Sequence, residues 1–194
     1  MREGWYPIAA CDDLPAAHIY QTQLCDEPLA VWRAADGHVN VWQDRCPHRG
    51  VRFSIGTVHA NELRCRYHAW RFGSGSGACT FVPAHPDRKP ADAIRATAYP
   101  SVERAGLVWT RLAGDQAAPP VLLPSTVPMR AMPVNRAEDA VVAAISAAEM
   151  PGVHLFVQPV SAGRTVIRGL AEDAALLGEH DDALERLRRT LESA

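Results

Sequence analysis

The sequence predicts a mainly β protein, with an antiparallel β-sandwich in its first half and a small α+β region at its C-terminal end. Short runs rich in aromatic and β-branched residues indicate strands, at residues 5–8, 18–20, 28–33 and 39–42. Asp36-Gly37 lies between the last two runs and favours a tight antiparallel hairpin. Residues 181–191 carry leucines on one helical face, which indicates an amphipathic helix.

The composition is that of an ordinary folded protein. Of 194 residues, 47% are hydrophobic and 22% are charged, which is enough to bury a sizeable core. The formal net charge is −2, and the basic residues are spread along the chain, so nucleic acid is not an expected partner. The first residues hold no apolar core of a signal peptide, and no apolar run approaches a membrane span. We therefore expect a cytoplasmic protein with no membrane partner.

Composition divides the chain into three segments. They are a first domain at residues 1–112, a Pro-rich linker at 113–128, and a small α+β region at 129–194. In the last segment, Asn135 is placed to cap a helix over about 137–148. Residues 153–160 and 164–170 predict a β-hairpin.

Two cysteines and two histidines stand in mixed pairs. Cys46 and His48 form a C-x-H pair, Cys65 and His68 form a C-x-x-H pair, and sixteen residues separate the pairs. A structural zinc site is one interpretation, although zinc modules usually place like ligands next to each other. A [2Fe-2S] cluster of the Rieske type needs two thiolates on one iron and two imidazoles on the other, so each of two loops supplies one ligand of each kind. The mixed pairs favour this cluster.

The residues around these ligands resemble the C-P-H-R-G and C-x-Y-H-x-W signatures of Rieske proteins, in particular the N-terminal domain of Rieske non-haem iron oxygenases. Residues 46–50 and 65–70 carry the two motifs, and the likeness covers roughly the first 110 residues. The resemblance implies a Rieske-type antiparallel β-sandwich with two cluster-binding loops. It also implies that the cluster is held by Cys46, His48, Cys65 and His68.

Three positions refine the resemblance. Val51 and Tyr67 stand where the cytochrome bc type carries two further cysteines joined in a disulfide. Ala69 stands where the oxygenase signature usually has Gly, and a positive φ there would strain Ala by roughly a kcal/mol. The other cysteines are interpreted as reduced thiols packed as small apolar groups; they are Cys11, Cys25 and Cys79.

The oxygenases that the first half resembles hold a mononuclear iron in a second domain, through D-x-x-H-x-x-x-x-H and a carboxylate. Placed on that motif, this chain has Ala147, Met150 and Leu155 where ligands would stand. Only 66 residues run from Met129 to the end, far fewer than such a domain needs. We therefore expect a shortened remnant without mononuclear iron. The alternative is an iron held by His154 and His180 with Glu149 or Asp181.

These observations favour a one-electron carrier or electron-transfer subunit with no catalytic side chain. Its expected partner is an electron-donor reductase or ferredoxin, with an oxygenase chain or a second copy as further partners. One alternative is a Rieske oxygenase component, which hydroxylates rings or removes O- or N-methyl groups from a small organic substrate together with a partner chain; another is a redox sensor. Arg45, Arg49 and Arg66 flank the ligands, either as solvated loop residues or as groups that help an acidic partner to dock.

The absence of the disulfide cysteines generates a prediction about the midpoint potential. With Val51 and Tyr67 at those positions, the potential should lie toward the low end of the Rieske range of about −150 to +300 mV. It should fall further in alkali, because an imidazole ligand loses its outer proton more readily when the iron is oxidised. Protein-film voltammetry from neutral to alkaline pH measures both effects. A high potential that does not change with pH would contradict the prediction.

Overall fold

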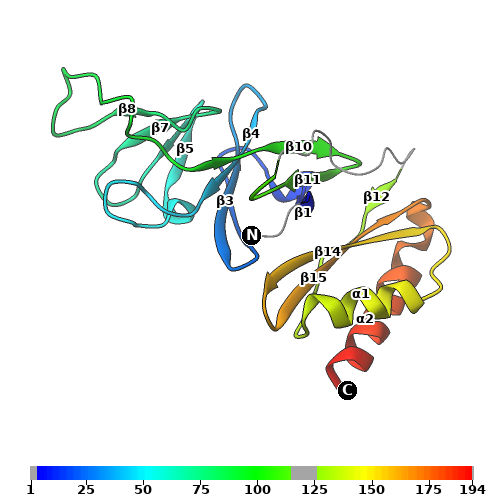
Figure 1. Ribbon diagram of the computed structural model, residues 1–194. Coiled ribbons are helices and arrows are strands. Elements are labelled where there is room, and N and C mark those ends of the chain that lie inside the picture. Colours follow the sequence, from blue (N-terminus) through cyan, green and yellow to red (C-terminus); the bar gives the residue numbers. More distant parts are fainter. Residues whose placement is uncertain (1–3, 115–125, 194) are drawn as a thin grey trace. The chain divides into compact units, whose positions relative to one another are not determined.

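The computed structural model describes residues 4–114 and 126–193, and most of its regular structure is β (Figure 1). The strands are β1 (Tyr6–Ala10), β2 (Ile19–Leu24), β3 (Glu27–Arg33), β4 (Val39–Gln43), β5 (Thr57–His59), β6 (Glu62–Arg64), β7 (Arg71–Gly73), β8 (Cys79–Phe81), β9 (Ala98–Tyr99), β10 (Ser101–Arg104), β11 (Leu107–Thr110), β12 (Val127–Pro128), β13 (Met132–Val134), β14 (Val153–Ser161) and β15 (Arg164–Ala171). The helices are α1 (Glu138–Ala147) and α2 (Leu177–Ser193), with short 3₁₀ turns at η1 (Cys11–Asp13), η2 (Phe53–Ile55) and η3 (Ala174–Leu176). Antiparallel strands with a small helical part near the C-terminal end confirm the predicted fold class.

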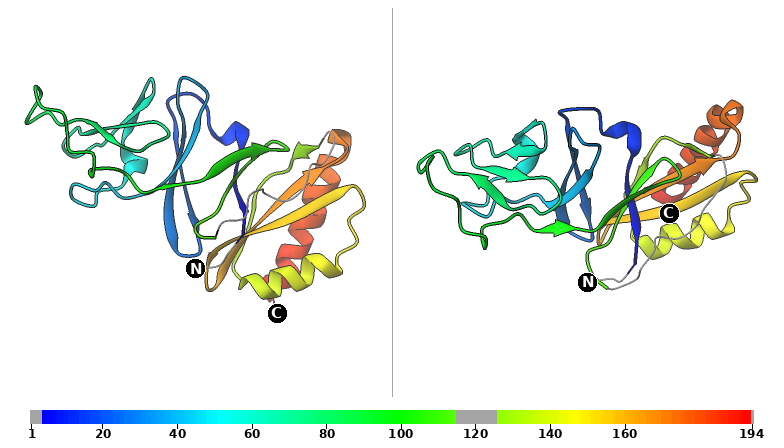
Figure 2. Two further views of the ribbon diagram at one scale, coloured as in Figure 1. Left: turned by 45° about the horizontal axis from the view of Figure 1, so that its top comes forward. Right: turned by 90° about the horizontal axis from the view of Figure 1, so that it is seen from above.

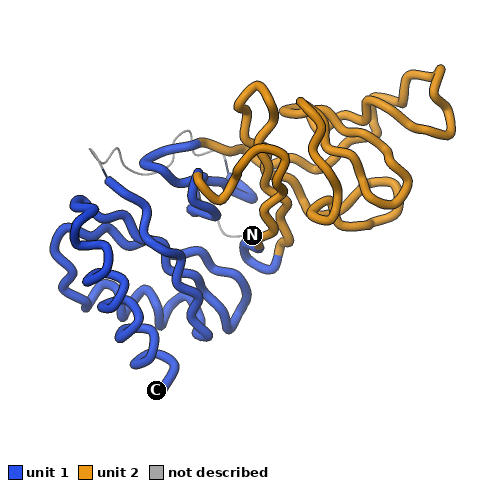
Figure 3. The backbone as a smooth tube through the Cα atoms, turned by 180° about the vertical axis from the view of Figure 1, so that it is seen from behind, with its two compact units in different colours: residues 1–11, 23–26, 103–194 blue, residues 12–22, 27–102 orange. Residues whose placement is uncertain are grey.

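The chain folds into two compact units, drawn in two colours in Figure 3. Unit 1 comprises Met1–Cys11, Gln23–Asp26 and Glu103–Ala194, and unit 2 comprises Asp12–Thr22 and Glu27–Val102. This division differs from the one drawn from composition, because β1 and β11 cluster with the C-terminal residues. The domain boundaries that the composition predicts, at residues 112 and 128, remain a prediction.

The predicted linker lies mostly between residues 114 and 126, outside the described residues. Its last two residues form β12, which pairs with β15. This end of the segment thus belongs to a sheet. Pro128 is tolerated there because a short outer strand does not need every backbone N–H.

Unit 2 is built largely from two four-stranded antiparallel sheets, β2-β3-β4-β9 and β5-β6-β7-β8. The hairpin predicted around Asp36-Gly37 is present: Arg33 pairs with Val39, and Gly37 has φ +89°. The second sheet is a meander of short hairpins. Its first turn contains Ala60, at φ +51°.

Aromatic side chains fill the centre of unit 2. The Trp32 and Trp42 rings meet edge to face at 5.1 Å, Trp42 meets Phe53 at 5.6 Å, and Phe53 meets Phe72 at 5.1 Å. All four side chains are buried. Trp5, which precedes β1, is only half-buried, and the Arg111 guanidinium lies 5.4 Å from the centroid of its ring.

Unit 1 is organised around the predicted hairpin of β14 and β15, with β12 and β13 on the other edge of β15. Helix α1 packs on β14, α2 packs on β13, and the helices touch each other on one face of this sheet (Figures 1 and 2). The core between helices and sheet contains Met129, Met132, Val134, Val141, Ile167, Ala171 and Leu184. On the opposite face β1 packs against β14, and the ring of Trp109 meets that of Phe156 at 5.0 Å.

Helix α1 lies where the sequence predicts it but has a different N-cap, and α2 begins earlier than predicted. Ala137, not Asn135, is the N-cap of α1, and no side chain caps that end. The backbone N–H of Asn135 instead donates to Oε1 of Glu192 in α2 at 2.8 Å. Helix α2 begins at Leu177, before the predicted residue 181, because Asp173 accepts from the Ala175 N–H and starts a 3₁₀ turn that continues into the helix. Neither described helix is long and apolar enough to cross a membrane.

The burial of one leucine generates a stability prediction. Leu184 of α2 is 0% exposed, whereas Leu176 is 38% exposed. Leu184→Ala should lower the free energy of unfolding by about 2–5 kcal/mol, since it removes apolar contacts and leaves a cavity. Leu176→Ala is the matched control and should change it by less than about 0.5 kcal/mol. Anaerobic urea unfolding followed by far-UV circular dichroism measures both. Equal effects would mean that α2 is not held on its own sheet by this side chain.

Candidate metal centre

The first ligand loop is closed by its own cysteine. The Cys46 N–H donates to the Val51 carbonyl at 2.8 Å, and the Gly50 N–H donates to the Cys46 carbonyl, also at 2.8 Å. Gly50 has φ +75°, a conformation in which glycine avoids strain. The chain therefore doubles back within six residues, and His48 lies at the tip.

The second ligand loop repeats this pattern. The Cys65 N–H donates to the Trp70 carbonyl at 2.9 Å, and the Ala69 N–H donates to the Cys65 carbonyl at 3.1 Å. The position equivalent to Gly50 is Ala69, and its φ is +56°. The condition under which this alanine would be strained, a positive φ, is therefore met. The two loops thus present their ligands by one backbone geometry.

A buried carboxylate supports the first loop from behind. Asp44, just before Cys46, is 4% exposed. It accepts from the backbone N–H of Ser54 at 2.7 Å and from the Ser54 hydroxyl at 2.6 Å. These hydrogen bonds join the two ends of the segment that contains Cys46 and His48. Hydrogen bonds to an ionised acceptor are among the stronger ones, so this pair should hold the loop firmly.

The two predicted cysteine ligands lie together in the apolar core of unit 2. Cys46 is 2% and Cys65 3% exposed, and both belong to the cluster that contains Phe53, Phe72 and Val82. Neither forms a disulfide. Burial above all, with the nearby Cys65, raises the pKa of the Cys46 thiol to about 12. A pair of thiolates here needs neighbouring positive charge, which bound metal supplies.

The two predicted histidine ligands face each other. Nδ1 of His48 is 3.1 Å from Nδ1 of His68, and their ring centroids are 4.8 Å apart. Burial first, then the positive charges of His68 and Arg49, lower the pKa of His48. A neutral imidazole is the form that binds metal. Because each ring turns Nδ1 toward the other, its Nε2 lies on the outward side.

Each of these imidazoles has its own aromatic neighbour. Trp70 stacks on His48, with centroids 4.1 Å apart and planes 8° from parallel. Tyr67 leans over His68, with centroids 3.8 Å apart. These contacts restrict how the rings can turn. They give Trp70 and Tyr67, both within the second motif, a role that the motif alone does not reveal.

The donors fit a two-iron cluster better than a single ion. The four side chains form a pair of thiols and a pair of imidazoles, as two irons with two ligands each require. No group of three or more His, Cys, Asp or Glu side chains that could hold one metal ion occurs in residues 4–114 and 126–193.

Some of the residues considered for a second metal make other contacts. Met150 and Leu155 pack against the core between the helices and sheet of unit 1, and Ala147 is exposed at the end of α1. His154 Nε2 lies 2.9 Å from Oε1 of Glu172. His180, Asp181 and Glu149 belong to no group of three metal-binding side chains in the described part of the chain.

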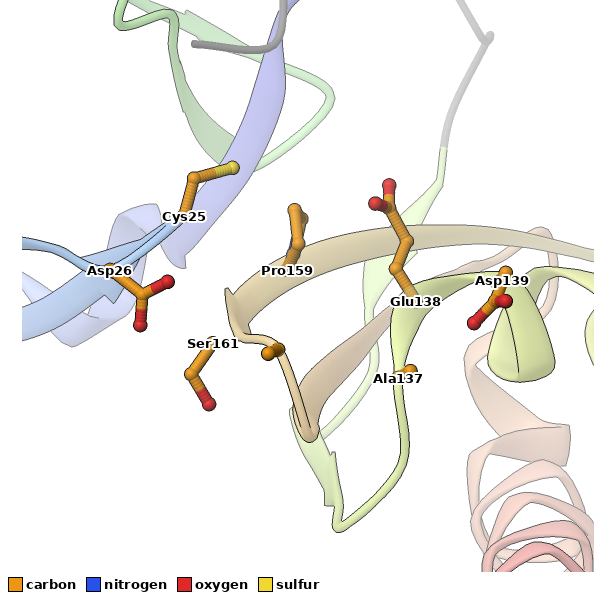
Figure 4. Close-up of a pocket in the computed structure, with 8 residues that line it drawn as sticks. Cys25, Asp26, Ala137, Glu138, Asp139, Pro159 and Ser161 are labelled. Carbon is orange, nitrogen blue, oxygen red and sulfur yellow. The ribbon is translucent and has the colours of Figure 1, made fainter.

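A separate cavity lies within unit 1, and Figure 4 shows the side chains around it. It has a volume of about 300 Å³ and is lined by Cys25, Asp26, Ala137, Glu138, Asp139, Pro159, Ser161 and Ala162. These residues come from the β2–β3 turn, the end of β14 and the start of α1. Three of the eight lining residues are acidic, and they belong to no group of three or more metal-binding side chains in the described part of the chain.

Two loops that each present one cysteine and one histidine define an iron–sulfur protein of the mixed-ligand class. The Rieske [2Fe-2S] domain family matches residues 4–100, which is half of the chain. The chain therefore belongs to the Rieske [2Fe-2S] domain family, whose members hold a [2Fe-2S] cluster.

Known relatives are redox proteins and oxygenase components. The chain is 43% identical to oxidoreductase NdmD of Pseudomonas putida over 131 residues, which are 68% of this chain and 22% of that protein. It is 35% identical to methylxanthine N1-demethylase NdmA of the same species over 117 residues, 58% of this chain and 33% of that protein. The chain thus spans about a fifth to a third of the length of these relatives.

Solved structures share the fold over nearly the whole chain. Dicamba monooxygenase superimposes with a TM-score of 0.80 at 18% identity, over 99% of this chain and 86% of that one. NdmA superimposes with a TM-score of 0.78 at 19% identity, over 98% of this chain and 81% of that one. At such identity the likeness is one of fold, and it extends beyond the Rieske part into the C-terminal sheet and helices.

The left-handed alanine generates a prediction. Ala69→Gly should raise the free energy of unfolding by about 0.5–1 kcal/mol, because glycine adopts φ +56° without strain. This gain should outweigh the greater conformational freedom that glycine has in the unfolded chain. Gly50→Ala, the mirror experiment, should destabilise the protein, since a Cβ there would stand 3.3 Å from Nε of Arg45 in a left-handed conformation. Anaerobic thermal unfolding of the cluster-loaded protein compares them. If Ala69→Gly instead lowered the free energy of unfolding, the prediction that Ala69 is strained would be wrong.

Proposed function

We propose that this chain is a Rieske iron–sulfur electron-transfer protein or subunit that carries one electron at a time. In this proposal Cys46 and Cys65 bind one iron, and His48 and His68 bind the other. When bound, the cluster supplies reversible one-electron chemistry. No side chain of this chain acts as a catalytic group.

The proposal rests on the facing imidazole pair, with Nδ1 atoms 3.1 Å apart, together with the two buried thiols of the same loops. The Nδ1 atoms of both rings are available to a metal, whereas the Nε2 atoms face away from it. His68 is exposed, and His48 is half-buried under Trp70. An electron entering or leaving near these ring edges would cross only a short distance from the surface.

The apolar core has a complementary role. Phe53, Phe72 and Val82 pack in the same cluster as the two cysteines, which keeps water away from the thiol side. Access from solvent is then confined to the histidine side. This asymmetry suits a carrier, because exchange with a partner occurs at one face and the cluster is sheltered at the others.

The partner that we propose is an electron-donor reductase or ferredoxin. One relative is named an oxidoreductase and another a methylxanthine N1-demethylase, so similar domains occur in redox systems that include oxygenases. An oxygenase chain is the natural acceptor in such a system. The oxygenase alternative for this chain itself is favoured by the likeness of its whole fold to dicamba monooxygenase. Against it, Met150 and Leu155 stand at ligand positions and pack in a core.

Histidine substitutions test the cluster assignment. Purified protein should be red-brown and, when reduced, give a Rieske electron paramagnetic resonance signal, whose average g value is low because imidazoles donate less charge than thiolates. His48→Ala and His68→Ala should each abolish the signal. His59→Ala is the matched control and should retain it, since His59 is exposed and its Nε2 lies 3.1 Å from the Thr57 hydroxyl. A colourless protein with one zinc would end the proposal.

The same preparations separate the carrier from the oxygenase alternative. Metal and sulfide analysis should give two irons and two sulfides per chain, and titration with ferrous iron should add no third tightly bound iron. Reduced protein mixed with oxygen and an aromatic or N-methylated substrate should form no hydroxylated or demethylated product. A third iron together with product would place the chain among the oxygenases.

A further inference from the structure

A small cavity opens beside His48 on the outer side of the first ligand loop. Its volume is about 320 Å³, and it is lined by Gln43, Arg45, Cys46, Pro47, His48, Arg49, Gly50, Arg95 and Thr97. Neither Cys65 nor His68 lines it, so it is distinct from the gap between the two loops. All of its lining residues belong to unit 2.

The charge of this cavity is one-sided. Arg45, Arg49 and Arg95 line it, and no Asp or Glu does. The whole chain carries a formal net charge of −2, so this local excess of positive charge does not follow from composition. Clefts lined by charge of one sign raise the local concentration of the opposite charge.

Two of these arginines are held in place. The Arg45 side chain lies over Gly50, with Nε 3.3 Å from the point where a Cβ of that residue would stand. Arg95 donates from Nε and Nη2 to the Asp92 carbonyl at 3.2 and 2.9 Å, and its side chain remains exposed. The guanidinium groups are therefore partly ordered before anything binds.

An exposed aromatic side chain continues this surface. Tyr67 is 58% exposed, and its ring lies 3.8 Å from that of His68. The His68 ring lies 4.8 Å from that of His48, which lines the cavity. Tyrosine and arginine are enriched in protein–protein interfaces, where aromatic contacts are ringed by polar groups.

We propose that this cavity, with Tyr67 beside it, is the docking site for an acidic electron-transfer protein. Arg45, Arg49 and Arg95 bind carboxylates of the partner, and Tyr67 provides the apolar contact. The inference rests on the proposed electron-carrier function and names the surface that serves it. Arg66, which flanks a cysteine in the sequence, does not line the cavity; Arg95, from a segment distant in the chain, does.

A protein is a better occupant than a free small anion. The cavity is at the lower limit of the volumes of about 300–1,000 Å³ that small-molecule sites enclose, so it has room for one or two side chains. A small anion would also leave Tyr67 uncovered. Brief complexes of electron carriers use small, charged interfaces, and charge complementarity chiefly sets their rate of association and their salt dependence.

The test measures binding by the intact, cluster-loaded protein. The probe is an oxidised plant-type [2Fe-2S] ferredoxin, an acidic electron carrier, titrated by calorimetry at low ionic strength. Arg95→Glu should weaken its binding at least about tenfold, because it places like charges together. Arg88→Glu makes the same change of charge at an exposed residue that does not line the cavity, and should bind as the wild type does. In about 1 M salt, where the Debye length is about 3 Å, the difference should vanish.

Each preparation is first checked for the Rieske paramagnetic signal. Its reduction rate is then measured with reduced methyl viologen, a small cationic reductant, in about 1 M salt, which screens the charge at residue 95. Unchanged signal and rate in Arg95→Glu, with weakened ferredoxin binding, support the docking site. A preparation of wild-type protein without the signal refutes the proposed function instead. If the signal is present and Arg95→Glu binds ferredoxin as tightly as Arg88→Glu, the docking site is wrong. The docking site is also wrong if the binding of inorganic phosphate depends on Arg95 while the binding of ferredoxin does not.

Discussion

Backbone hydrogen bonds made by the two cysteines themselves fix the geometry on which the rest of the site depends. In each loop the cysteine N–H reaches the carbonyl five residues on, and its carbonyl accepts from the residue before that one. The side chains at the tip are then positioned by main-chain geometry. This explains how a six-residue loop with few side-chain contacts can hold a histidine at a defined distance from its counterpart.

The repeated loop also shows which positions constrain the sequence. The left-handed residue is glycine in one loop and alanine in the other, so the main-chain hydrogen bonds outweigh the strain at Ala69. Around the loops, the contacts are unequal: Asp44 and Ser54 support the first loop, whereas the aromatic contacts come from the second. The site is therefore symmetric in its backbone and asymmetric in its surroundings.

Sequence reasoning found the features that are local in the chain. The mixed ligand pairs, the Asp36-Gly37 hairpin and the left-handed Ala69 each depend on a few neighbouring residues, whose conformational preferences can be read directly. What it missed depends on segments far apart. Arg95 carries no motif, and only the folded chain brings it to the wall beside His48. Asn135 had a suitable capping side chain, but the contact of its backbone with Glu192 on α2 takes precedence.

The turn between β2 and β3 has a consequence for where this chain can be divided. Cys25 and Asp26 both adopt left-handed conformations, and their N–H groups donate to the carbonyls of Pro159 and Val160 on β14 at 2.7 and 2.9 Å. Gln158 likewise donates to the Gln23 carbonyl at 2.9 Å. Unit 1 is thus assembled from pieces that lie before, within and after unit 2 in the sequence. A fragment cut after the ligand motifs would carry β1 and this turn without β14, which accepts their hydrogen bonds. The metal loops are therefore better transplanted as the segment Glu27–Val102, cut at both of its ends, than by severing the chain at one point.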